Sequence, residues 1–146
     1  MRFDKLTTKL QEALADAQSQ AVGNDNQYID PVHLVLVLLA QDDGGARSLL
    51  QRAGVNVTGL TPALQHAMTR LPKVSGVGGE VQIGRELAAL LNLADREAQK
   101  HGDQFIASEM VLLGLVDDKS DAGRAARENG LTRKALEAAI NAVRGG

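Results

Sequence analysis

The sequence predicts an all-α protein with two tandem four-helix repeats, about eight helices in all. Leu and Ala, the best helix formers, occur 21 times each among the 146 residues. Only three residues are aromatic, whereas strands are enriched in aromatic and β-branched side chains. The chain also matches itself at an offset of about 77 residues, which indicates an internal repeat.

The first repeat is expected at about 4–72. Apolar residues recur at steps of three and four over 6–21, which predicts an amphipathic helix. Asp30 and Pro31 are a typical N-cap and first helical residue. The helix that they open, 32–40, is apolar on all sides and is therefore expected to be buried.

The remaining helices follow from the same periodicity. Two more are expected in the first repeat, at 46–53 and 60–71. The glycine-rich, aperiodic stretch at about 73–82 reads as a linker. The second repeat, at about 83–144, is expected to contain helices at 83–98, 106–116, 122–129 and 132–143.

The repeat is supported by apolar positions that coincide at the offset of 77. The pairs are Leu10 with Leu87, Leu14 with Leu91, Ala17 with Ala94, Ala21 with Ala98 and Ile29 with Ile106. Beyond a one-residue slip, Gly54 meets Gly130 and Leu60 meets Leu136. Chance agreement is the alternative in a chain so rich in Leu and Ala, but the helical spacing of the pairs favours a true repeat.

Composition excludes several classes of function. The formal net charge is −2, no basic run is present and the aromatics are few, so a nucleic-acid-binding surface is not expected. The absence of Cys excludes disulfides and thiolate metal sites. The longest apolar run, 34–40, is too short to span a membrane, and the first residues lack the pattern of a signal peptide. We therefore expect a cytoplasmic protein.

Catalytic motifs are also missing from the sequence. The glycines at 76–84 lack the Lys and Ser/Thr of a phosphate-binding loop. The three histidines fall on separate elements without a second ligand at i+4, so surface or partly buried histidines are expected rather than a metal site. A free-standing hydrolase remains the weakest hypothesis, because no serine has the G-x-S-x-G context.

Three segments resemble the Clp repeats at the N-terminus of Clp-type ATPases. They are FDKLT at 3–7, YIDPVHL at 28–34 and FIASEM at 105–110. The resemblance extends from residue 1 to residue 146 and, within the family, is strongest to the bacterial disaggregases. It implies an all-helical fold with pseudo-twofold symmetry.

The resemblance also implies a function. Such a domain would bind unfolded or aggregated polypeptide and deliver it to a hexameric ATPase ring, and the isolated domain would be monomeric. ATP and Mg²⁺ would bind only in downstream modules, so no cofactor is expected in this chain. The alternative is a docking domain for a folded adaptor protein of a Clp-type protease or unfoldase.

Candidate apolar binding residues are Leu93 and Met110. Their partners at the offset of 77 are polar, Asp16 and His33, so the second repeat gains apolar character at these positions. Exposed apolar area suits an unfolded chain, and Met adapts to many partners. The alternative is that both residues simply fill the core.

Candidate polar binding residues are Thr7, Asp103 and Glu109. The two carboxylates flank an expected helix start, where helix capping alone would explain them. The resemblance implies that these positions handle substrate. One departure from the family pattern is Ala107, a poor N-cap residue, although Ser108 is placed to cap one residue later.

Overall fold

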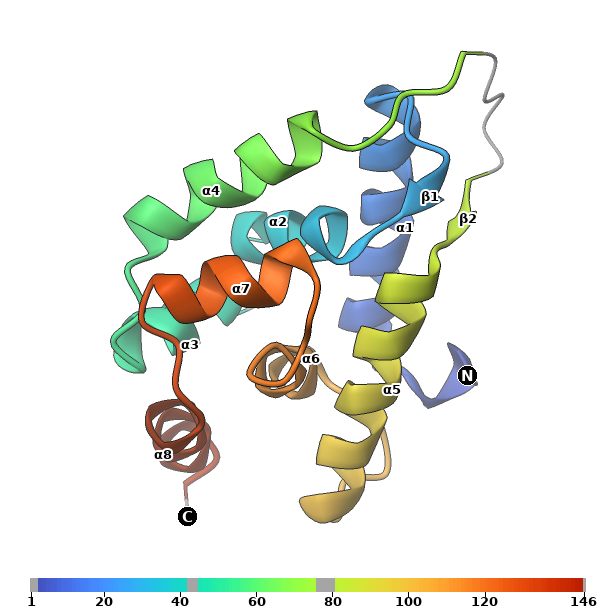
Figure 1. The fold of residues 1–146 in the computed structure, drawn as a ribbon. Coiled ribbons are helices and arrows are strands. Elements are labelled where there is room, and N and C mark those ends of the chain that lie inside the picture. The colour runs from blue at the N-terminus through green and yellow to red at the C-terminus, as the bar shows by residue number, and fades with distance from the viewer. Residues whose placement is uncertain (1–2, 42–44, 76–80, 146) are drawn as a thin grey trace.

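The computed structural model describes residues 3–41, 45–75 and 81–145. Within these residues the chain forms eight α-helices and two very short strands, which confirms the predicted all-α class (Figure 1). The first half holds η1 (Phe3–Lys5), α1 (Thr8–Gly23), β1 (Tyr28–Ile29), α2 (Pro31–Ala40), α3 (Ala46–Arg52) and α4 (Val57–Thr69). The second half holds β2 (Gln82–Ile83), α5 (Arg85–Lys100), α6 (Ser108–Gly114), α7 (Asp121–Glu128) and α8 (Arg133–Val143).

Some boundaries differ from the expected ones for local reasons. Helix α4 begins before the predicted position 60, because the Asn56 side chain accepts a hydrogen bond from the Gly59 amide and caps the helix earlier. Helix α6 ends at Gly114 and begins later than expected, since Ile106 is part of a bridge with Leu6 instead. Residues 76–80 of the predicted linker lie outside the described residues.

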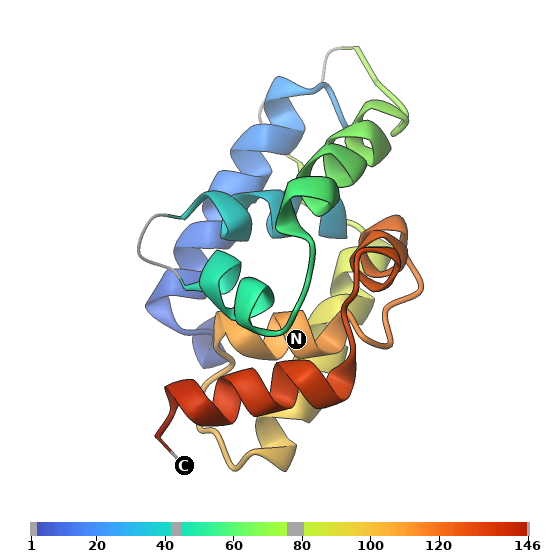
Figure 2. The same cartoon turned by 90° about the vertical axis from the view of Figure 1, so that its left-hand side faces the viewer.

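The two halves are related by a pseudo-twofold axis. Helix α4 packs on α7 and α3 packs on α8, which are equivalent contacts between the repeats (Figures 1 and 2). The matched turns at Gly54 and Gly130 also meet: a Cβ added to Gly130 would lie 3.1 Å from the Gly54 carbonyl oxygen. The Asn56 amide donates to the Asn129 carbonyl at 2.8 Å beside them. The axis therefore passes between these two turns.

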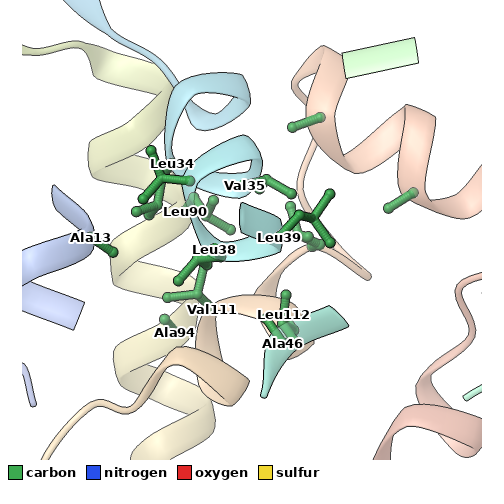
Figure 3. Packing of buried hydrophobic residues seen from close by; sticks show 14 of the residues in the cluster. Ala13, Leu34, Val35, Leu38, Leu39, Ala46, Leu90, Ala94, Val111 and Leu112 are labelled. Carbon is green, nitrogen blue, oxygen red and sulfur yellow. The ribbon is translucent and has the colours of Figure 1, made fainter. Parts of the chain in front are cut away.

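Helix α2 lies at the centre of the core, as its apolar sequence predicts. Every residue from Pro31 to Leu39 is buried. Figure 3 shows Leu34 and Leu38 among side chains that come from α1, α5 and α6. Leu residues of this kind each contribute roughly 2 kcal/mol through burial, so the stability of the fold rests on aliphatic packing.

All three aromatic side chains lie outside this core. Phe3, Tyr28 and Phe105 are 47–50% exposed. Tyr28 and Phe105 occupy equivalent places in the two repeats, each just ahead of a buried helix. The core is thus built without aromatic residues, and the few aromatics face solvent.

Candidate functional site

The start of each repeat pairs with the segment that precedes the buried central helix of the other repeat. The Ile106 amide donates to the Lys5 carbonyl at 2.7 Å, and the Thr7 amide donates to the Ile106 carbonyl at 3.1 Å. At the equivalent place β1 pairs in parallel with β2, and the Gly84 amide donates to the Ile29 carbonyl at 3.1 Å. The first junction places the start of α1 beside the start of α6, and so brings Thr7 close to the segment that leads to Glu109.

Thr7 is the N-cap of α1 and is half-buried. Its side-chain oxygen accepts a hydrogen bond from the Leu10 amide at 3.2 Å, which satisfies one of the free N–H groups of the first turn. The equivalent residue in the second repeat, Gly84, caps α5 without a side chain. Thr7 therefore has a structural role as a helix cap, and a ligand that bound its hydroxyl would have to do so alongside this hydrogen bond.

Asp103 and Glu109 lie together, and both bind one guanidinium group, that of Arg144. Arg144 donates from Nη1 and Nη2 to the two oxygens of Asp103, both at 2.9 Å. Its Nε and Nη2 also donate to Glu109 Oε2, at 3.2 and 3.1 Å. Hydrogen bonding to Asp103, followed by that to Glu109, raises the pKa of Arg144 above its usual range.

Leu93 lines a pocket between α5 and the connection from α6 to α7. The pocket has a volume of about 320 Å³, and its other lining residues are Glu86, Ala89, Asn92, Arg96, Asp117, Asp118, Lys119 and Ser120. Leu93 is half-buried, so part of its side chain is accessible from the pocket. The pocket therefore combines the apolar side chains of Leu93 and Ala89 with charged and polar side chains.

Gly114 makes room for Leu93. A Cβ at Gly114 would lie 3.3 Å from the Leu93 Cβ and 3.1 Å from the Leu90 Cδ1 atom, closer than most Cβ atoms approach a neighbour. At the offset of 77, Gly114 corresponds to Val37 and Leu93 to Asp16. The larger side chain on one helix is thus matched by the smaller one on its neighbour.

The first repeat has a pocket at the equivalent place with different chemistry. That pocket has a volume of about 240 Å³ and is lined by Asp16, Gln20, Val37, Ala40 and Gln41. A carboxylate at position 16 stands where the second repeat has the leucine. Only the second-repeat pocket therefore offers a leucine side chain to an apolar ligand.

Met110 does not take part in this surface. Its side chain is fully buried, with 0% of its area exposed, so the alternative that it fills the core applies. Ser108 does not cap α6 either: Ala107 is the N-cap, without a side-chain hydrogen bond, and the Ser108 hydroxyl is buried without a partner among the described residues. The spacing of residues along the sequence does not show that Met110 and Ser108 are buried.

A further pocket, on the N-terminal side of α1, was not predicted from the sequence. It has a volume of about 530 Å³ and is lined by Phe3, Asp4, Leu6, Gln11, Leu14, Ala15, Gln18, Ile29, Val81 and Ile83. These residues come from η1, α1 and β1 of the first repeat and from 81–83 at the start of the second, so only folding brings them together. The available signal was Phe3, an aromatic residue ahead of the first amphipathic helix.

A buried ion pair holds the second repeat together near the Leu93 pocket. Glu97 on α5 is only 3% exposed, and both its oxygens accept hydrogen bonds from Arg133 of α8, at 3.0 and 3.1 Å. Arg133 also donates to Asp117 at 3.0 Å. Because Asp117 lines the Leu93 pocket, this network fixes one wall of it.

His33 is buried, which corrects the expectation of a surface or partly buried histidine. Its Nδ1 accepts from the Asp30 amide at 2.9 Å, so Nε2 carries the proton and donates to Asn26 Oδ1 at 2.8 Å. Burial lowers the pKa of His33 to about 4. Burial and the nearby Glu86 raise the pKa of Asp30 to about 6.

Among residues 3–41, 45–75 and 81–145, no helix is both long and apolar enough to cross a membrane. Within the same ranges, no three His, Cys, Asp or Glu side chains are grouped as metal ligands would be.

Comparison with protein families decides the identity of the domain. The model of the Clp repeat (R) N-terminal domain matches residues 5–129. The chain is a Clp repeat N-terminal domain. All 146 residues of this Clp repeat domain align at 49% identity with the chaperone protein ClpB of Pseudomonas putida, and at 47% with that of Vibrio cholerae. The chain spans 17% of the length of each of these relatives.

Solved structures share the fold of this Clp repeat domain. The Hsp104 N-terminal domain from Candida albicans superposes with a TM-score of 0.80 at 18% identity, covering 97% of this chain and 92% of that one. The N-domain of ClpV from Vibrio cholerae gives 0.79 at 18% identity, with 96% and 85% covered. A ClpV N-domain in complex with a VipB peptide gives 0.77 at 20% identity, with 94% and 86% covered.

Proposed function

We propose that this Clp repeat domain binds exposed apolar segments of unfolded or aggregated polypeptide, as an accessory domain of a ClpB-type disaggregase. The observation that carries the proposal is the Leu93 pocket, in which a half-buried leucine lies among charged and polar side chains. A pocket of this kind accepts one apolar side chain and leaves its polar lining residues to contact peptide groups. The similarity to ClpB over the whole chain supports the same role.

The difference between the two repeats supports this assignment. The equivalent first-repeat pocket has Asp16 in place of the leucine, so an apolar side chain would be disfavoured there. One shallow pocket that accepts many sequences cannot exploit specific contacts, so we expect weak binding.

The captured segment would then pass to a hexameric ATPase ring, where ATP and Mg²⁺ are bound outside this domain. We also propose that the domain itself is monomeric, non-catalytic and cytoplasmic.

A test of the proposal combines peptide titration with Leu93→Asp. An unfolded, leucine-rich peptide added to the isotope-labelled chain should shift the amide signals of Leu93 and its pocket before those of the first repeat. Leu93→Asp introduces the residue of the equivalent position and should weaken binding about tenfold, the size of a modest interface hot spot. Thermal stability should change little, because Leu93 is only half-buried.

The matched control is Asn92→Asp. Asn92 is exposed and lines the same pocket, so this variant adds the same charge but keeps the leucine. It should retain most of the binding. Equal losses in both variants would show that charge, rather than the leucine side chain, governs binding. A large loss of stability in Leu93→Asp would instead assign Leu93 to the core, and shifts confined to the first repeat would reject the pocket.

The second candidate function is docking of a folded adaptor. It is favoured by the ClpV N-domain, a structural relative solved with a peptide of one defined protein. An adaptor would bury a fixed patch with fixed stoichiometry, whereas unfolded clients would bind heterogeneously. Saturable one-to-one binding to a folded protein, with no response to unfolded peptides, would favour the adaptor.

A further inference from the structure

The pocket of the first repeat is lined by two glutamines whose amide oxygens have no hydrogen-bond donor. Its volume is about 240 Å³, and it lies between α1 and the end of α2, lined by Asp16, Gln20, Val37, Ala40 and Gln41. Within the described residues, the buried side-chain atoms that lack a partner belong to Gln20, Gln41 and Ser108. Two of these three side chains thus line one pocket. Buried acceptors of this kind call for a water, an ion or a ligand that donates to them.

The third acceptor at this pocket is the carboxylate of Asp16. It is exposed, and it forms no hydrogen bond or ion pair in the part of the chain that the structure describes. Asp16 and Gln20 are four residues apart on α1 and therefore share a face. The opposite wall is the C-terminal end of α2, whose last turn carries no basic residue. Arg47 donates to the Leu39 carbonyl there, at 3.3 Å, but does not pair with Asp16. The partial negative charge of a helix end favours a cation beside it.

The equivalent of Gln20 in the second repeat is satisfied by a cation from within the chain. At the offset of 77, Gln20 corresponds to Glu97, whose two oxygens accept hydrogen bonds from Arg133. Arg133 is the first residue of α8, and the first residue of the equivalent helix α4 is Val57. A valine side chain has no donor. The first repeat therefore keeps an acceptor at this place but lacks the internal cation.

Gln41 differs from its equivalent in the same way. At the offset of 77 it corresponds to Asp118, which accepts hydrogen bonds from the Ser120 hydroxyl and the Gly123 amide. Gln41 itself donates to the Lys9 carbonyl at 3.5 Å, while its own oxygen accepts from no group among the described residues. The second repeat thus fills its acceptors internally, and the first repeat leaves them for a donor from outside.

We propose that the first-repeat pocket binds a primary ammonium group, supplied as a lysine side chain of a bound polypeptide. An ammonium carries three donors on a flexible stem, which suits one carboxylate and two amide oxygens that come from two helices. A guanidinium is a planar fork that prefers a bidentate partner, and a divalent metal ion requires more oxygen ligands than these three. The last torsion of a glutamine side chain is broad, so each amide oxygen can turn towards the ligand. The site goes beyond the proposed function, because it lies in the other repeat and needs no apolar ligand group.

The test uses probes without large apolar side chains, so that its result does not depend on the Leu93 pocket. A short Gly-Ser peptide with one lysine, and the same peptide with Nε-acetyl-lysine, are titrated into the isotope-labelled chain. The lysine peptide should shift the side-chain amide signals of Gln20 and Gln41 saturably, with an affinity on the order of millimolar, because the Asp16 carboxylate is exposed. The acetylated peptide should not shift them. Butylammonium chloride is the third probe, and tighter binding of it than of the lysine peptide would assign the pocket to a free amine instead of a polypeptide.

Three variants locate the binding. Asp16→Asn should weaken binding of the lysine peptide about two- to fivefold, the range of an exposed ion pair. The matched control is Glu12→Gln, which removes an exposed carboxylate one turn earlier on α1 and should leave the affinity unchanged. Gln20→Met keeps the length of the side chain but removes the acceptor, and should also weaken binding.

The outcomes separate this site from the proposed function. Equal losses in Asp16→Asn and Glu12→Gln, equal shifts with the two peptides, or no saturable shift with the lysine peptide would overturn the ammonium site. None of these results would touch the Leu93 pocket. Conversely, a leucine-rich peptide that failed to bind the unchanged chain would reject the proposed function, while selective binding of the lysine peptide would still establish the first-repeat site.

Discussion

Removal of Arg133 should destabilise the fold, because it leaves the buried carboxylate of Glu97 without its main partner. In the folded chain both carboxylate oxygens of Glu97 accept hydrogen bonds from Arg133, and the only other cation that pairs with it in the described structure is Lys100, at 3.6 Å. Arg133→Met preserves most of the apolar stem but removes the donor. The carboxylate, 3% exposed, would then be left in the protein without its main partner.

The expected loss of stability follows from that geometry. Breaking a buried ion pair by removing one partner costs roughly 3–5 kcal/mol. Because the Arg133 side chain is 32% exposed and Lys100 remains, we expect the lower end, about 3 kcal/mol. For a chain of this size each kcal/mol lowers Tm by roughly 2–4 °C, so the expected shift is about 6–12 °C.

The pH dependence provides a second, signed readout. Hydrogen bonding from Arg133 lowers the pKa of Glu97 below its usual value, despite the opposing effect of burial. A folded-state pKa below the unfolded one gives a stability contribution that is present at neutral pH and lost as the pH falls through the folded pKa. The difference in Tm between Arg133→Met and the unchanged chain should therefore shrink towards pH 3.

Thermal unfolding followed by circular dichroism at pH 7 and pH 3 checks both expectations. Arg124→Met, which breaks the exposed pair with Asp121, is the control and should cost less than about 1 kcal/mol. Replacing both Glu97 and Arg133 by Met should recover much of the loss, since no charge is then left buried. The reasoning is refuted by a Tm shift below about 2 °C in Arg133→Met, or by a shift that does not change with pH.

Two other predictions concern stability. Gly123→Ala should lower the free energy of unfolding in urea by about 2 kcal/mol or more, because the added Cβ would lie 2.3 Å from the Asp118 carbonyl oxygen. The control is Gly23→Ala, where the added Cβ would meet no atom within 4 Å and which should cost less than about 1 kcal/mol. Equal effects of the two variants would contradict the packing argument. The second prediction concerns pH. Because the pKa of His33 is lowered to about 4 in the folded chain, the free energy of unfolding decreases as the pH falls from about 6.5 to 4. Because the pKa of Asp30 is raised to about 6, its contribution increases the free energy of unfolding over nearly the same interval. Asp30→Asn should therefore make Tm fall more steeply between pH 6.5 and 4 than in the unchanged chain, and an identical slope would show that Asp30 does not offset His33.

The helices were predictable because each carries its own signal. The step of three and four in 6–21 and the apolar run after Pro31 depend on neighbours in sequence, and the structure places α1 and α2 there. The repeat offset likewise predicts which helices are equivalent. The two short strands had no such signal, since each consists of two residues and exists only because a segment of the other repeat lies beside it.

The candidate site was predictable only in part. The change from Asp16 to Leu93 could be read from the offset, and the structure places both residues in equivalent pockets. Met110 could not be assigned in the same way, because a polar-to-apolar change looks identical whether the side chain faces a pocket or the core. The structure buries it completely. Their binding roles, like those of Thr7, Asp103 and Glu109, stay predictions.

The sequence by itself determined the helical class, the doubled plan and the aliphatic composition of the core, because these depend on local propensity and on periodicity along the chain. Only the tertiary structure decided that Arg144 meets Asp103 and Glu109, that Arg133 neutralises Glu97, and that Gly114 leaves room for Leu93. Each of these contacts joins residues from different helices or turns. Their distances are set by how the helices pack, which the spacing of residues within any one helix does not encode.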